Sequence, residues 1–410
     1  MKSAPFYEAD ILLPDLPAAA VDAWQRWAVI ACDQFTSEPA YWQDCRHLTA
    51  GGASALNLIL PEVWLDRREE LTTDIHSAMD HYCSGGFFRE RHGMMLVSRT
   101  LPDGRVRQGI LGCIDLMDYD WSPDSTSLIR ATEKTVAERL PPRMEIRSGA
   151  CVELPHAMLL MDDKEDVMIP AVSAALADEE PVYDFDLMLG GGHITGRFLG
   201  EAEVRFVQDF LSRLGGDFLF AVGDGNHSIA AAKECFEALR RELGNEAAMR
   251  HPARYTLAEL VNLHTPALDF EPIYRVAFGA DFEEITGEFS RWLEAHRVTG
   301  GASVSFTCIS GEKEMEISDH AAFSALPVAV LQRFLDEYAA AHPEVRLDYI
   351  HGEDSVHALS SAGAVGFLFR GMSKDDLFPG VSADGVLPRK TFSMGHAKDK
   401  RYYIEARRIL

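Results

Sequence analysis

The residues best suited to chemistry lie in a short turn after an apolar run: Asp224, Gly225, Asn226 and His227. The run from Phe218 to Val222 predicts a buried strand, and residues 228–243 predict a helix that Gly244 ends. The first turn of a helix presents backbone N–H groups without intrahelical partners and a partial positive charge. Because glycine lets an anion approach the backbone, the turn predicts a phosphate-binding site. An ordinary turn with Ser228 as the helix cap is the alternative.

A second stretch, residues 127–150, is rich in basic side chains although the chain as a whole is acidic. Its cations are Arg130, Lys134, Arg139, Arg143 and Arg147. On a helix, Arg130 and Lys134 would share a face, and a solvated helix with charge pairs is one interpretation. The other interpretation is catalytic. A carboxylate such as Glu133, held among cations, can accept a hydroxyl proton while the cations stabilise phosphoryl charge.

Two further places could contribute. Lys390 and Thr391 put a cation and a hydroxyl beside Phe392, although a charged tail is often only a surface feature. Asp33 falls within a predicted strand, Trp27 to Phe35, and carboxylates at strand ends often face a ligand crevice. Helix capping or a turn would explain Asp33 equally well. We expect His156, on another predicted strand, to be a structural histidine.

Composition narrows the possible partners. The 410 residues include 39 basic and 64 acidic side chains, a net charge of −25 that disfavours nucleic acid as a partner. Apolar runs are too short for a membrane span, and the acidic start lacks the features of a signal peptide. Seven cysteines without a CxxC pair predict reduced thiols in the cytoplasm and no zinc site. Nothing in the sequence indicates the oligomeric state.

The periodicity of the chain predicts an α+β fold, with a mixed sheet and helices on its faces. We expect helices at 18–26, 61–84, 201–214, 282–296 and 327–341, and antiparallel hairpins at 86–120, 151–170 and 187–200. The region after residue 341 is expected to be irregular. Three regions are predicted: 1–125, a core at 126–275, and 276–410 completing the site.

Three stretches, in order, carry a resemblance to a family. Arg130 to Thr135 resemble an R-P-H-E-x-T pattern, Asp224 to His227 a D-G-H-H-R pattern, and Pro388 to Thr391 a P-x-K-[ST] element. Ala31 to Asp33 loosely match a P-P-Y-D segment. The chain thus resembles an uncharacterised bacterial family related to ParB/sulfiredoxin-like proteins, among them kinases of free L-serine. It departs from the patterns at Thr132, where the family has His, and at Ser228, where it has Arg.

The resemblance implies a ParB/sulfiredoxin-like core and a phosphotransferase. Its reaction would move a phosphoryl group between ATP or ADP and a small hydroxy-amino acid, L-serine or O-phosphoserine, with Mg²⁺ as companion ion. Glu133 would be the general base, with Asp224 and His227 also in the catalytic group. Two binding sets are implied: Gly225, Asn226, Ser228, Arg130, Arg143 and Arg147 for the nucleotide; and Lys390, Thr391 and Asp33 for the substrate.

Two other functions are alternatives to a phosphotransferase. A non-catalytic nucleotide-binding switch, as in ParB, is the main alternative, and replacement of Glu133 would separate it from a kinase. A sulfiredoxin-like reductase needs a reactive cysteine in the turn, and residues 224–227 contain none.

Overall fold

The structure, a computed structural model, describes residues 4–410 and divides them into two compact units. The first unit comprises the chain up to Leu268 and the segment His396–Leu410, and the second comprises Asp269–Gly395. The predicted boundaries differ from this division. The boundary at 275/276 falls inside a single strand, β14 (Phe270–Phe278), and that at 125/126 separates strands of one sheet.

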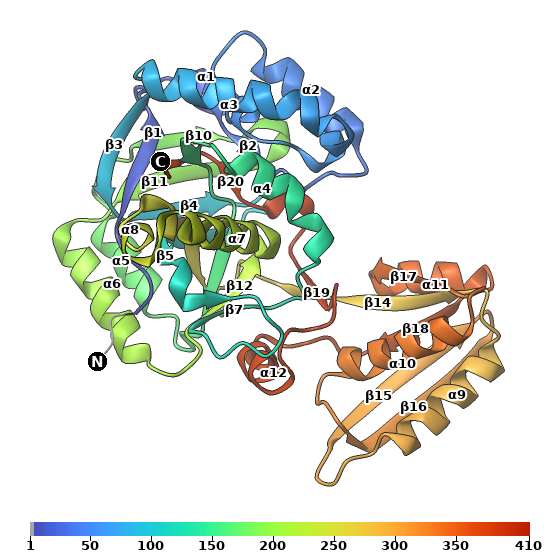
Figure 1. The fold of residues 1–410 in the computed structure, drawn as a ribbon. Helices are drawn as coiled ribbons and strands as arrows, with labels where there is room; N and C mark the ends of the chain where they lie inside the picture. The colour runs from blue at the N-terminus through green and yellow to red at the C-terminus, as the bar shows by residue number, and fades with distance from the viewer. Residues whose placement is uncertain (1–3) are drawn as a thin grey trace. The chain divides into compact units, whose positions relative to one another are not determined.

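A nine-stranded mixed sheet organises the first unit (Figure 1). In spatial order its strands are β10 (Tyr183–Asp186), β11 (His193–Phe198), β4 (Met95–Thr100), β5 (Val106–Asp115), β13 (Tyr255–Asn262), β9 (Met158–Met161), β12 (Phe220–Asp224), β7 (Ile129–Ala131) and β6 (Tyr119–Asp120). Three small antiparallel pairs accompany it: β1 (Ala9–Pro14) with β3 (Phe88–Gly93), β2 (Val29–Ile30) with β20 (Tyr402–Tyr403), and β8 (Val152–Glu153) with β21 (Arg407–Arg408).

Both faces of this sheet are covered by a hydrophobic core. Because successive side chains of a strand point to opposite sides, a single strand contributes to both cores. In β4, Met95 and Val97 pack into one core cluster while Leu96 packs into the other. The first core is rich in tryptophan and is closed by α1 (Val21–Trp27), α2 (Pro39–Thr49) and α3 (Arg68–Ser84). The second is closed by α5 (Met168–Ala175), α6 (Glu201–Leu214) and α7 (Asn226–Leu243). The fold is therefore the α+β arrangement that the sequence predicts.

Short elements complete the first unit. They are α4 (Pro141–Arg147), α8 (Asn245–Ala248) and seven 3₁₀ turns: η1 (Ala55–Leu58), η2 (Glu62–Arg67), η3 (Leu116–Asp118), η4 (Ala137–Arg139), η5 (Met188–Gly190), η6 (Pro252–Arg254) and η8 (Ala397–Asp399). The second unit has its own sheet, ordered β16 (Lys313–Ala322), β15 (Ala302–Ser310), β18 (Val365–Phe369), β14, β17 (Arg346–His351), with β19 (Phe392–Met394) also on β14. Its helical elements are α9 (Phe282–Ala295), α10 (Pro327–Ala341), α11 (Glu353–Ser361), η7 (Lys374–Asp376) and α12 (Leu377–Asp384).

Three local predictions are wrong. Residues 151–170 do not form a hairpin, because β8 pairs with β21 and the segment after the acidic turn begins α5. Arg130 lies in strand β7 rather than on a helix, so it shares no helical face with Lys134. The region after residue 341 is not irregular, since β17, α11 and β18 follow each other there. The hairpins at 86–120 and 187–200 are confirmed.

Candidate functional site

The turn between β12 and α7 is built as the glycine predicts. Gly225 is the N-cap of α7 with φ of 79°, in the left-handed region that favours glycine. The side chain of Asp224 folds back, so that Oδ1 accepts the N–H of Gly225 at 3.0 Å. Its Oδ2 is buried and lies 3.5 Å from Nζ of Lys400. The first turn of α7 therefore faces the same edge of the sheet as this carboxylate.

The neighbouring strands bring other predicted residues to that edge. β7 is parallel to β12, with Ala131 opposite Val222, so both strands end side by side. The Oδ1 atom of Asn226 accepts the backbone N–H of Thr132 at 3.2 Å, and the Thr132 hydroxyl donates to Val222 O at 2.6 Å. Asn226 and Thr132 thus lock the turn to the end of β7. Glu133 is the next residue and is half-buried.

His156 is the centre of a polar cluster that joins four parts of the chain. It lies two residues before the first residue of β9, whose amino end lies at this edge because β9 is antiparallel to β12. Its Nε2 lies 3.1 Å from Oγ of Ser228 and 3.8 Å from Oδ2 of Asp33, and its Nδ1 lies 2.8 Å from the hydroxyl of Tyr403. Ser228 is therefore not the helix cap; its hydroxyl binds His156 instead.

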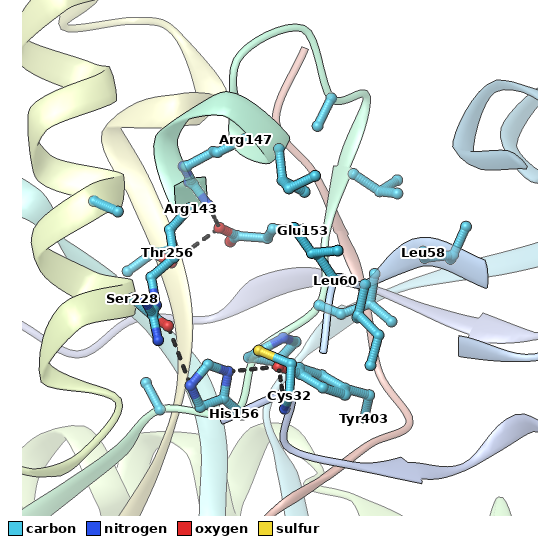
Figure 2. A pocket seen from close by; sticks show the side chains of 18 of the residues that line it. Cys32, Leu58, Leu60, Arg143, Arg147, Glu153, His156, Ser228, Thr256 and Tyr403 are labelled. Carbon is cyan, nitrogen blue, oxygen red and sulfur yellow. Dashed lines mark hydrogen bonds and ion pairs between the residues drawn. The ribbon is translucent and has the colours of Figure 1, made fainter. Parts of the chain in front are cut away.

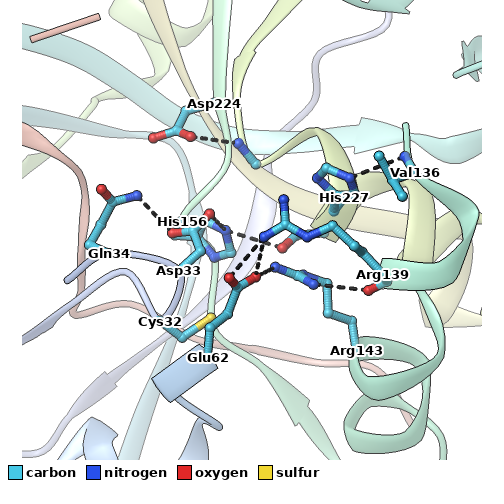
Figure 3. A network of polar contacts seen from close by, with 12 residues as sticks. Cys32, Asp33, Gln34, Glu62, Val136, Arg139, Arg143, His156, Asp224 and His227 are labelled. Atoms are coloured by element: carbon cyan, nitrogen blue, oxygen red, sulfur yellow. Dashed lines mark hydrogen bonds and ion pairs between the residues drawn. The ribbon is translucent and has the colours of Figure 1, made fainter. Parts of the chain in front are cut away.

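Asp33 belongs to the same cluster (Figure 3). It lies in a turn after β2, and its Oδ1 accepts the amide N–H of Gln34 at 2.9 Å. Burial alone would raise the pKa of Asp33, but His156, Gln34 and two nearby cations hold it below its ordinary value. Asp33 is therefore a carboxylate at neutral pH.

Two arginines flank the turn. Arg139 and Arg143 both bind the carboxylate of Glu62, as Figure 3 shows. Burial, followed by the charges of these two arginines, lowers the pKa of His227 to about 4. His227 is thus neutral at pH 7, and its Nε2 accepts the N–H of Val136 at 3.2 Å. A neutral histidine beside two guanidiniums can donate a hydrogen bond without adding charge.

A cavity of about 150 Å³ opens beside this cluster (Figure 2). His156, Ser228, Tyr403 and Cys32 line one part of it, and apolar side chains line most of the remainder. Arg147 also lines the cavity, where it binds the buried carboxylate of Glu153. Burial raises the pKa of Cys32 to about 12, so its thiol stays protonated at neutral pH.

One predicted site residue, Arg130, is not brought to this edge. The guanidinium of Arg130 binds the carbonyls of Ser127 and Asp217, which precede β7 and β12, so it points to the opposite end of these strands. Lys390 and Thr391 lie in the second unit. Thr391 is buried and donates to Pro388 O at 2.6 Å, and Nζ of Lys390 lies 5.3 Å from the centre of the Tyr349 ring.

Four residues of the site are not predicted by the sequence. From sequence, His156 is expected to be structural, and Glu62, Glu153 and Tyr403 show no pattern that assigns them to a site. Only the single histidine within an apolar strand could have been a signal, because the other three gain their roles from pairings distant in sequence. β20 carries Tyr403 next to β2, across more than 370 residues.

Fold and site together define an α+β protein with a cavity where parallel strands β7 and β12 end beside the start of a helix. Residues 16–338 match the family described as protein of unknown function (DUF1015), and the chain belongs to this family. No curated protein matches it.

Several solved structures show limited likeness to the chain. A free serine kinase variant in complex with AMP is 13% identical, with 71% of this chain and 90% of that chain covered and a TM-score of 0.39. A conserved hypothetical protein from Pyrococcus furiosus is 14% identical, with 70% and 90% covered and a TM-score of 0.35. SbnI with a C-terminal truncation, from Staphylococcus aureus, is 11% identical, with 70% and 82% covered and a TM-score of 0.34. Likeness at this level carries no conclusion about the activity of the chain.

Among residues 4–410, none of the helices is both long enough and apolar enough to cross a membrane.

Proposed function

We propose that the protein is a nucleotide-dependent phosphotransferase with a ParB/sulfiredoxin-like core, which moves a phosphoryl group between ATP or ADP and a small hydroxy-amino acid. One observation carries the proposal. The Gly225 turn opens α7 at the edge where Asp224, His227 and two arginines gather, and a helix start with nearby cations suits a phosphate group. All seven cysteines are free thiols, which agrees with a cytoplasmic site of action.

The reaction needs a base for the acceptor hydroxyl. The hydroxyl oxygen would attack the terminal phosphorus, the bond to the leaving nucleotide oxygen would break, and the hydroxyl proton would pass to a carboxylate. Glu133 and Asp33 are the two candidates for this carboxylate. Asp33 is ionised and belongs to the His156 cluster, whereas Glu133 follows the strand next to the turn.

A magnesium ion fits one feature of the site. Oδ2 of Asp224 is buried and accepts no hydrogen bond among residues 4–410, and Nζ of Lys400 lies 3.5 Å from it. A hard cation bound to this oxygen would displace the ammonium group. Asp224 would hold the ion. A bound Mg²⁺ would offset phosphate charge.

The test is a mass-spectrometric assay of the purified protein with Mg²⁺, ATP or ADP, and a panel of free hydroxy-amino acids. Glu133→Gln and Asp33→Asn are assayed beside the wild type. The control is Glu145→Gln, whose half-buried carboxylate on α4 pairs with Arg68 and does not line the cavity. We expect phosphorylated amino acid with the wild type and the control, and a loss of at least a hundredfold in the variant that lacks the base.

Other outcomes are equally informative. Nucleotide-dependent thermal stabilisation without any phosphorylated product would favour the non-catalytic nucleotide-binding protein. Neither product nor stabilisation would mean that the turn binds no nucleotide, and the proposal would be wrong.

A further inference from the structure

The cavity beside His156 has a shape and lining of its own. Its apolar wall comes from four places: the segment that begins at the end of η1, the 3₁₀ turn η2, helix α3, and helix α4. The residues of this wall include Leu58, Ile59, Leu60, Leu65, Met79 and Ile146. A cavity of about 150 Å³ with such a wall accommodates an apolar body of benzene size. L-serine, with a single methylene in its side chain, would leave most of this wall without an apolar partner.

The cavity is lined by two arginines, Arg143 and Arg147, and two glutamates, Glu62 and Glu153. Arg143 shares the carboxylate of Glu62 with Arg139, which lies outside the cavity. On another wall, Arg147 shares the carboxylate of Glu153 with Arg407. Each lining carboxylate is thus paired with two guanidiniums.

The same two arginines have hydrogen-bonding capacity left over. Nε of Arg143 and Nη2 of Arg147 are buried and have no acceptor among residues 4–410. Buried donors without acceptors are costly, and an anionic group of a ligand would satisfy them. The polar part of the cavity adds the Ser228 hydroxyl and the His156 ring, 3.1 Å apart, which suit a hydroxyl group of the same ligand.

We propose that this cavity is the acceptor site of the phosphotransferase, and that its ligand is a hydroxy acid with an apolar body larger than that of serine. The carboxylate of the ligand lies toward Arg143 and Arg147, its hydroxyl lies toward Ser228 and His156, and its apolar group contacts the wall formed by Met79 and Ile146. The assignment as acceptor site rests on the proposed function, whereas the binding of such an acid does not.

Binding is measured first by isothermal titration calorimetry on the full-length protein. The ligands are L-serine, lactate, 2-hydroxyisocaproate and 3-phenyllactate. Each buried methylene contributes about 0.8 kcal/mol, so affinity should rise roughly fourfold for each added carbon until the cavity is full. We expect 2-hydroxyisocaproate to bind at least tenfold more tightly than lactate or serine, and its methyl ester at least tenfold more weakly. Affinity that does not depend on ligand size, or no binding of any acid, would overturn the inference.

A matched pair of variants locates the site. Ile146→Phe enlarges a side chain of the wall, and Met144→Phe enlarges one on the same helix that does not line the cavity. The first should weaken 2-hydroxyisocaproate binding more than tenfold, and the second should leave it unchanged. Equal binding by both variants would place the ligand elsewhere. If Ile146→Phe does not fold, the size series with the wild type still decides the question.

The two proposals fail separately. Size-dependent acid binding without phosphoryl transfer to any acid would contradict the proposed function and support this inference. Phosphoryl transfer to serine without size-dependent binding would support the proposed function and contradict this inference.

Discussion

At the scale of single residues, polar contacts from four residues converge on Glu153. Its carboxylate binds Arg147 and Arg407, accepts the Thr256 hydroxyl at 2.9 Å, and accepts the backbone N–H of Leu257 at 3.0 Å. Burial alone would raise the pKa of Glu153, but the two arginines outweigh it and lower the pKa to about 2. Glu153 therefore stabilises the fold only while it is ionised.

Glu153→Gln should lower the free energy of unfolding at pH 7 by about 3–5 kcal/mol, because it leaves two buried guanidiniums without their shared anion. The measurement is urea unfolding, with Glu145→Gln as the control, because the Glu145 carboxylate on α4 is half-buried and pairs with one partly exposed arginine, Arg68. The control should change stability by less than about 1 kcal/mol. Equal effects of the two substitutions would contradict this account.

The lowered pKa of Glu153 also predicts how the free energy of unfolding depends on pH. The pKa of Glu153 is lower in the folded protein than in the unfolded chain, where it is 4.5, so its contribution is present above pH 4.5 and is lost as the pH falls toward 2. The wild type should thus lose on the order of 3 kcal/mol more than Glu153→Gln across this window. Parallel pH profiles of the two proteins would disprove the assignment.

At the scale of elements, the start of α7 depends on Gly225. A Cβ atom added there would lie 2.9 Å from Cα of Ala157 and 3.1 Å from its Cβ, in addition to the strain of φ at 79°. Gly244 at the other end of α7 has a similar φ of 82°, but a Cβ there would meet no atom within 4 Å. The two glycines therefore separate backbone strain from steric collision.

Gly244→Ala should cost about 1 kcal/mol, the backbone strain alone, while Gly225→Ala should cost at least about 1 kcal/mol more. Gly225→Ala should also abolish nucleotide-dependent thermal stabilisation, because the turn moves away from Ala157. Chemical denaturation and thermal melts with and without ATP measure both effects. Equal destabilisation by the two substitutions, with nucleotide binding retained, would mean that the turn tolerates a side chain.

At the scale of the whole molecule, the second unit is an insertion. The chain leaves the first unit after Leu268 and returns to it at His396. The first and last residues of the second unit lie close together, because Phe270 pairs with Met394. The second unit has a separate aromatic core in which Phe289 packs against Phe306 and Phe334, with ring centres 4.9 and 4.6 Å apart. Each unit thus has the packing that independent folding requires.

Replacing residues 269–395 by a short Gly-Ser linker should leave the first unit folded, with a cooperative thermal transition and nucleotide binding intact. Circular dichroism and calorimetry measure both properties. Phosphoryl transfer by this deletion variant also tests Lys390 and Thr391: loss of turnover with nucleotide binding retained would support their predicted role. Unfolding of the first unit would contradict independent folding.

Local sequence was enough to predict much of the fold. Helices α6 and α10 occur where the apolar spacing predicts them, and the β4–β5 hairpin turns at Pro102 to Gly104. Such elements are set by short-range spacing, capping and turn residues. The hairpin predicted at 151–170 failed because β8 finds its partner in β21, about 250 residues away, and strand pairing at that distance leaves no local pattern.

The candidate site likewise combines features that local sequence determines with features that depend on the tertiary structure. The Gly225 turn and the helix after it were determined by the sequence alone, because glycine and the helix formers act over a few residues. The roles of His156, Tyr403 and Glu153, and the distance of Arg130 from the turn, were decided only by the tertiary structure. Each depends on which strands lie side by side, and that depends on packing among residues hundreds of positions apart.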